Sequence, residues 1–72
     1  MINHVTILMP LLNEGTTVFR PVEAHQLSGE IFLILGSVPE DEEWAFQPGT
    51  KVRCVTRKDG SGAMDLVAAK AC

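Results

Sequence analysis

A chain of 72 residues with a formal net charge of −3 has room for one small domain and carries no excess of positive charge. The mild negative charge disfavours wholesale attraction to nucleic-acid phosphates or to anionic membrane surfaces. The longest apolar run, residues 31–35, is far shorter than the roughly 20 residues that a membrane helix needs, which predicts no transmembrane span. We therefore expect a single domain over residues 1–72, with a core kept thin by the small size of the chain.

Turn-forming residues divide the chain into apolar segments of strand length. The first segment covers residues 4–9, where β-branched side chains favour a strand. The second covers residues 16–27 and is interrupted by Pro21, which has no amide hydrogen to donate. This segment is predicted to be an edge strand or to bulge around Arg20 and Pro21, and a bulge would bring Phe19 and Val22 to one face.

The third segment, residues 30–35, follows a tight turn at Ser28 and Gly29 and completes a hairpin. A strand of a small barrel normally alternates between core and water, but this segment is apolar at every position after Glu30. Either the C-terminal segment or a second copy of the chain must cover its outer face. We expect a homodimer whose interface is formed by Ile31, Phe32, Leu33 and Ile34.

Pro48 and Gly49 fit the two central positions of a type II turn, after which a fourth strand is expected over residues 50–56. Val52 and Cys54 share its apolar face. The alanine-rich last segment, residues 64–70, is compatible with a short helix, but the glycine-bearing turn before it favours a strand. These segments predict an all-β, five-stranded small barrel resembling the SH3-like folds, with an OB-like arrangement as second choice.

No catalytic or metal site is predicted. The two histidines and two cysteines lack the close spacing of a zinc site, and Cys54 with His4 or His25 is the only possible nucleophile and base. On the apolar face of its strand, Cys54 is expected to be an inert thiol. No cofactor is expected, and with no secretory signal in the sequence both cysteines are expected to be thiols in the cytoplasm.

The candidate partner-binding residues surround the only tryptophan of the chain. Trp44 either closes one end of the barrel or stands partly exposed beside acidic residues as a binding anchor. The run of four acids before it resembles neither a calcium loop nor a catalytic carboxyl pair, and Arg20 is a partner for one of these carboxylates. The hypothesis is a non-catalytic protein-binding or regulatory module that uses Arg20, Glu42, Glu43 and Trp44.

The alternative hypothesis is a small nucleic-acid-binding barrel. Four of the six basic residues lie on or just after the fourth strand, namely Lys51, Arg53, Arg57 and Lys58. Nucleic-acid barrels usually carry exposed aromatic residues on the same strands for base stacking, and none interleave here. Nucleic acid is therefore not the expected partner, and a solvated face is the simpler interpretation.

Two motifs, within residues 14–22 and 39–54, give the chain a resemblance to a known group of sequences. The residues that carry it are Glu14, Gly15, Thr16, Val18, Phe19, Arg20, Pro21, Val22, Pro39, Glu40, Glu43, Trp44, Phe46, Pro48, Gly49, Val52 and Cys54. The pattern resembles a group of small uncharacterised bacterial proteins, in which Trp usually occupies the position of Phe19. The resemblance implies a bacterial, cytoplasmic origin and no assigned activity.

Overall fold

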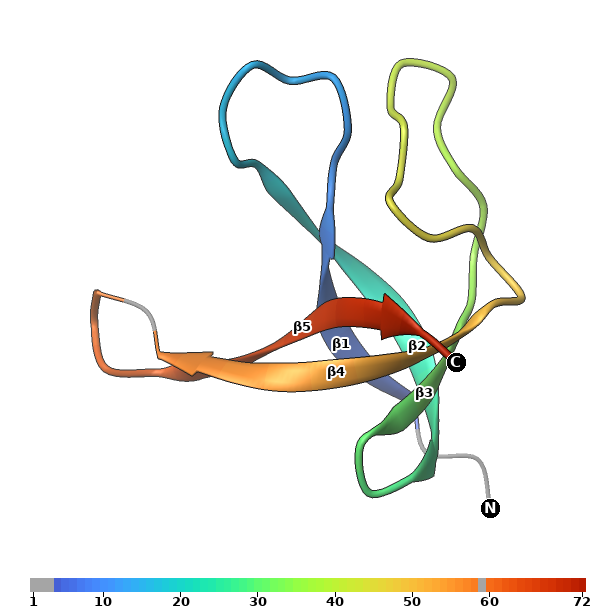
Figure 1. Cartoon of the computed structure of the whole chain (residues 1–72), viewed down its shortest axis with the longest axis vertical. Coiled ribbons are helices and arrows are strands. Elements are labelled where there is room, and N and C mark those ends of the chain that lie inside the picture. Colours follow the sequence, from blue (N-terminus) through green and yellow to red (C-terminus); the bar gives the residue numbers. More distant parts are fainter. Residues whose placement is uncertain (1–3, 59) are drawn as a thin grey trace.

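The structure, a computed structural model, describes residues 4–58 and 60–72. Within these residues the chain forms a strand at each of the predicted segments. It forms no helix there, and thus none that is long and apolar enough to cross a membrane. The strands are β1 (His4–Pro10), β2 (Phe19–Ser28), β3 (Ile31–Ile34), β4 (Lys51–Lys58) and β5 (Met64–Ala71) (Figure 1). The all-β prediction is confirmed, and the C-terminal segment is a strand.

The five strands close into a barrel in sequence order, consistent with a small SH3-like barrel. Consecutive strands pair antiparallel. In such a meander the odd-numbered strands all run in the same direction, so β1 and β5 can close the barrel only by parallel pairing. The observed closure is parallel, with Leu8 of β1 opposite Val67 of β5.

Side chains of alternate residues on the strands fill the barrel, as the period of two in a strand requires. Phe32 and Ile34 of β3 are each only 1% exposed. Cys54 is buried on the same face of β4 as Val52, which confirms the predicted apolar face of that strand. The core cluster consists of Ile7, Met9, Val22, Ala24, Phe32, Ile34, Trp44, Val52, Cys54 and Ala68.

The core position of β3 corrects part of the predicted dimer interface. Phe32 and Ile34 fill the interior of the monomer, so the assignment of these two residues to a surface between copies was wrong. Ile31 and Leu33 point outward and are partly covered. In the strand register, Leu33 lies between His25 and Lys51, whose side chains extend along the same outer face.

Pro21 lies in a part of β2 that pairs on one side only. The β1–β2 register runs without interruption from the pair His4 and His25 to the pair Pro10 and Phe19, whereas β3 begins to pair with β2 only at Ala24. The edge prediction is therefore confirmed for this half of the strand.

The amide of Leu11 donates to the carbonyl of Val18, so Val18 directs its backbone polar groups toward β1. Successive residues of a strand direct these groups to opposite sides, so the nitrogen of Pro21 faces away from β1, on the side where β2 has no partner strand. Proline therefore costs no hydrogen bond at this position. The predicted bulge at Arg20 and Pro21 is wrong. Register shifts occur instead between Gln26 and Ser28 and between Arg53 and Cys54.

Without a bulge, Phe19 and Val22 lie on opposite faces of β2. Val22 is part of the core, and Phe19 is partly exposed on the outer face. The guanidinium carbon of Arg57 lies 4.7 Å from the centre of the Phe19 ring, a distance at which a cation is attracted to an aromatic face. Phe19 is therefore covered by a side chain from β4.

The predicted type II turn is confirmed before β4. Gly49 has a φ of 87°, and the amide of Thr50 donates to the carbonyl of Gln47 at 3.1 Å. A residue with a Cβ atom is strained at such a φ, which explains the glycine. The amide of Gly49 also donates to the carbonyl of Ile34, so the turn is attached to the end of β3.

Candidate functional site

Two loops lie side by side at one end of the barrel (Figure 1). Residues 11–18 connect β1 to β2, and residues 35–50 connect β3 to β4. The amide of Leu12 donates to the carbonyl of Glu43 at 2.8 Å, and the amide of Ala45 donates to the carbonyl of Pro10 at 2.9 Å. These bonds flank a bridge between Leu11 and Trp44, so the acidic loop is held against the end of β1.

Trp44 closes the barrel and is not a surface anchor. Its side chain is 4% exposed and belongs to the core cluster. The indole nitrogen donates to Oε1 of Glu42 at 3.0 Å, which satisfies the polar atom of a ring that is otherwise buried. Of the two alternatives for Trp44, closure of the barrel end is confirmed, and the exposed anchor is wrong because the side chain is buried.

Arg20 and Glu42 form the predicted ion pair between β2 and the acidic loop. Nε of Arg20 donates to Oε2 of Glu42 at 2.6 Å, and Nη2 lies 2.5 Å from the same oxygen. The hydrogen bond from Arg20, followed by that from Trp44, lowers the pKa of Glu42, and the same bond raises the pKa of Arg20. Glu42 therefore connects the barrel end to β2 and is occupied within the chain.

The lowered pKa of Glu42 predicts a loss of stability in acid. A carboxyl whose pKa is lower in the folded state stabilises the fold above its unfolded pKa, and this contribution disappears as the pH falls through the folded pKa. We expect Glu42→Gln to lower the free energy of unfolding at neutral pH and to flatten its fall below the ordinary glutamate pKa. Urea unfolding across a pH series measures this effect, and equal acid slopes for both proteins would refute it.

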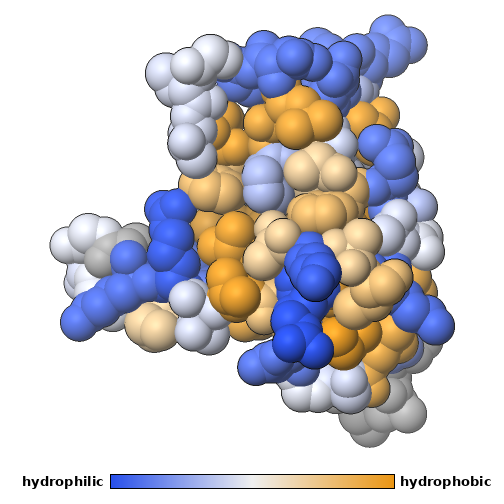
Figure 2. Space-filling model, viewed as in Figure 1, coloured by the Kyte–Doolittle hydropathy of each residue, from blue (hydrophilic) through white to orange (hydrophobic). Residues whose placement is uncertain are grey.

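The two loops border a shallow, open acidic hollow of about 220 Å³, and hydrophilic residues gather at this end of the molecule (Figure 2). Leu12 contributes an apolar side chain that is 46% exposed. Nδ2 of Asn13 donates to Oε2 of Glu43 at 2.6 Å across the hollow. The lining residues are Leu12, Asn13, Glu14, Glu40, Asp41, Glu42 and Glu43.

The first loop is the part of this surface that sequence reasoning missed. Leu12, Asn13 and Glu14 follow the predicted first strand and look like an ordinary turn. The sequence feature that could have indicated this surface is Leu12, an apolar residue that lies beyond the first predicted strand and outside its alternating apolar pattern. Of the predicted binding residues, Glu42 and Glu43 line the hollow, whereas Trp44 is buried in the core.

The four basic residues of β4 do not form one continuous free surface. All four are exposed, but Nη1 of Arg53 lies 3.8 Å from Oε2 of Glu30, and Arg57 covers the Phe19 ring. Val55 and Thr56 separate these residues into two pairs along the strand. The nucleic-acid hypothesis therefore has a weaker geometric basis than the spacing in the sequence indicates.

Cys54 and the histidines lie on opposite sides of the barrel wall. Burial raises the pKa of Cys54 to about 11, so the thiolate needed for nucleophilic attack is scarce at neutral pH. His4 and His25 face each other on the outer surface with ring centres 6.3 Å apart, and Nδ1 of His4 lies 3.7 Å from Oε1 of Glu23. The structure does not assemble the pair that a cysteine nucleophile requires.

Comparison with known proteins adds no assignment. No family model, curated protein or solved structure matches the chain. The resemblance to small uncharacterised bacterial proteins consequently stays a prediction from the two sequence motifs.

Proposed function

We propose that this chain is a protein-binding module that recognises a basic segment of another protein through the acidic hollow. The observation that carries the proposal is the position of Leu12, an exposed apolar side chain that lines the same hollow as the acidic residues of both loops. An apolar contact near charged groups supplies affinity, and the charges select partners that carry the opposite charge. The complementary segment carries an apolar residue flanked by Lys or Arg.

The construction of the hollow supports this function because its walls are fixed before a partner arrives. The backbone of Leu12 is bonded to that of Glu43, and the side chain of Asn13 is bonded to the carboxylate of Glu43. Glu42 is held by Arg20 and Trp44. A surface ordered in the free protein loses less conformational entropy on binding.

The charges that remain for a partner are those of Glu14, Glu40 and Asp41, of which Asp41 also interacts electrostatically with Arg20. All three line the hollow, and no ion pair within the described residues involves them. Such a rim attracts Lys and Arg and repels phosphate. The geometry therefore favours a basic protein segment over nucleic acid at this surface.

A matched pair of serine variants tests the proposal. The probe is a short blocked peptide with a leucine between lysines, titrated against the full chain by calorimetry. We expect Leu12→Ser to weaken binding about tenfold, which corresponds to about 1.4 kcal/mol, and added salt to weaken it further.

The control variant is Met64→Ser, which removes another exposed apolar side chain, 62% exposed, at the start of β5. This variant is expected to bind the peptide as tightly as the original chain. Equal affinity for Leu12→Ser and the original chain, or equal losses in both variants, would refute the assignment of the hollow.

A further inference from the structure

The second half of β4 is, like the first half of β2, an open strand edge of the barrel. β3 has four residues and β4 has eight, so β3 pairs with β4 only from Lys51 to Arg53. Beyond that point β4 continues to pair with β5 through Lys58 and Met64. Residues 55–58 therefore pair on one side and have no strand on the other.

The polar groups of this edge are arranged to receive another strand. The amide of Cys54 points to the β3 side, where it donates to the carbonyl of Glu30 at 2.9 Å. Successive residues of a strand direct their backbone groups to opposite sides, so Thr56 and Lys58 direct their amides and carbonyls to this same open side. Val55 and Arg57 direct theirs toward β5.

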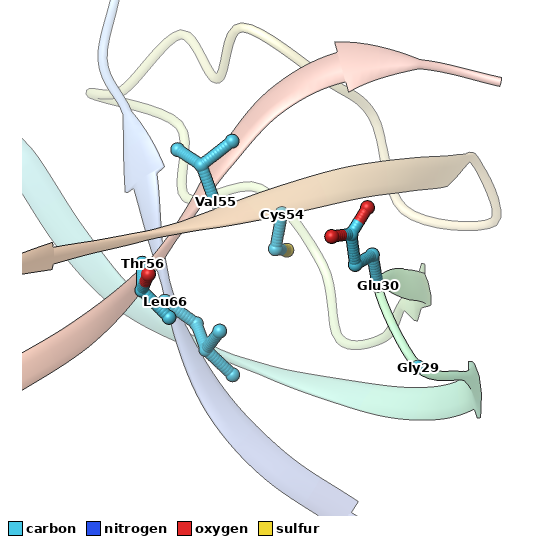
Figure 3. A pocket seen from close by; sticks show the side chains of 6 residues that line it. All are labelled: Gly29, Glu30, Cys54, Val55, Thr56 and Leu66. Carbon is cyan, nitrogen blue, oxygen red and sulfur yellow. The ribbon is translucent and has the colours of Figure 1, made fainter.

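A hollow of about 320 Å³ adjoins the open edge, at the place where a longer β3 would continue (Figure 3). It is lined by Gly29, Glu30, Cys54, Val55, Thr56 and Leu66. The side chains of Cys54, Thr56 and Leu66 lie on one side of β4, and Val55 points to the other (Figure 3). An added strand would find there a place for one apolar side chain.

We propose that this edge binds an extended acidic and apolar peptide segment of a partner protein, which pairs with Thr56 and Lys58 as an additional strand. Pairing of this kind takes its affinity from the backbone and its specificity from alternate side chains. One apolar side chain of the segment enters the hollow beside Cys54 and Leu66. Acidic side chains alternate with it and lie on the other face of β4, beside Arg57, whose guanidinium also contacts the Phe19 ring.

The charges at the edge favour this occupant over a second copy of the chain. Antiparallel pairing of β4 with β4 of another copy would gather two arginines and two lysines within a few residues, and like charges across strands are destabilising. Oε2 of Glu30, on the rim of the hollow, lies 3.8 Å from Nη1 of Arg53, so the negative charge of this carboxylate is balanced by the guanidinium. Nucleic acid offers neither backbone partners for Thr56 nor an apolar side chain for the hollow.

The test uses the full, ¹⁵N-labelled chain and a short blocked peptide of alternating valine and glutamate. We expect the amide resonances of Thr56 and Lys58 to shift on titration and to become protected from hydrogen exchange. The variant Thr56→Pro removes only the amide that faces the open side, because edge positions tolerate proline. It is expected to weaken binding at least tenfold while retaining the unfolding transition of the barrel.

A charge exchange keeps the test decisive if the proline variant fails to fold. Arg57 is exposed, and Arg57→Glu is expected to weaken binding of the valine–glutamate peptide and to strengthen binding of the matched valine–lysine peptide. Binding of the first peptide without a change at the Thr56 and Lys58 amides would overturn the proposal. So would tighter binding of a single-stranded oligothymidylate than of the peptide. The acidic hollow is unaffected by these variants, so the two proposals fail separately.

Discussion

Replacing Trp44 with alanine is expected to unfold most of the chain and not merely to remove a contact surface. The buried indole closes the barrel end, and truncation of a buried Trp typically costs about 3 to 5 kcal/mol. A core in a chain of this size rarely supplies more than about 3 to 5 kcal/mol of net stability. The loss of this one side chain is thus comparable to the whole stability of the domain.

Far-UV circular dichroism during thermal and urea unfolding measures this effect. Leu12→Ala, which truncates an exposed residue of the facing loop, is the control and is expected to change stability little. A cooperative transition of Trp44→Ala near that of the original chain would contradict the placement of the ring. Loss of partner binding in Trp44→Ala therefore says nothing about a surface role until folding has been measured.

Phe32→Ala is the second substitution with a large expected effect. Phe32 is 1% exposed in the centre of β3, so a decrease of about 3 to 5 kcal/mol in the free energy of unfolding is expected. Leu33, the next residue, points to the outer face and is only partly covered. Leu33→Ala is therefore expected to cause a clearly smaller decrease, measured by the same urea titration.

This pair of substitutions also tests which side chains of β3 face the core. A shift of one residue in the strand register would exchange the inward and outward faces. Equal losses for Phe32→Ala and Leu33→Ala, or a larger loss for Leu33→Ala, would contradict the observed register. Both variants replace a large apolar residue of the same strand with alanine, so the difference between their free energies of unfolding reports mainly on the burial of the two side chains.

Local residue chemistry was sufficient to predict the strands and one turn. Proline and glycine at positions 48 and 49 require a particular turn, and the structure contains it. The alternation of Val52 and Cys54 predicts the buried face of β4 because the period of a strand is fixed by its backbone. Such features depend on neighbouring residues alone.

The extent of pairing between strands could not be predicted in the same way. The length of β3 relative to β2 and β4 determines which halves of those strands stay open, and it depends on how the whole barrel closes. The positions of the register shifts also depend on how the whole barrel closes, and for this reason no bulge occurs at Pro21, where one was predicted. Proline requires only an unpaired nitrogen, and an open edge satisfies this requirement as well as a bulge does.

The candidate site was predicted in part. An ion pair between Arg20 and one carboxylate of the acidic run was predicted, and the structure forms it with Glu42. Whether Trp44 points inward depends on the size of the barrel opening, about which the sequence around Trp44 carries no information. The role of Leu12 was not predicted because only the contact between two loops distant in sequence brings it next to the acidic residues 40–43.

Residue-by-residue mapping of the bound leucine–lysine peptide shows whether the acidic hollow is a protein-binding surface. In a ¹⁵N-labelled full chain, the peptide is expected to shift the amide resonances of residues 12–14 and 40–43. The amides of residues 51–58 should keep their positions. Shifts confined to β4, or no shift at any residue while the barrel remains folded, would contradict peptide binding at the acidic hollow.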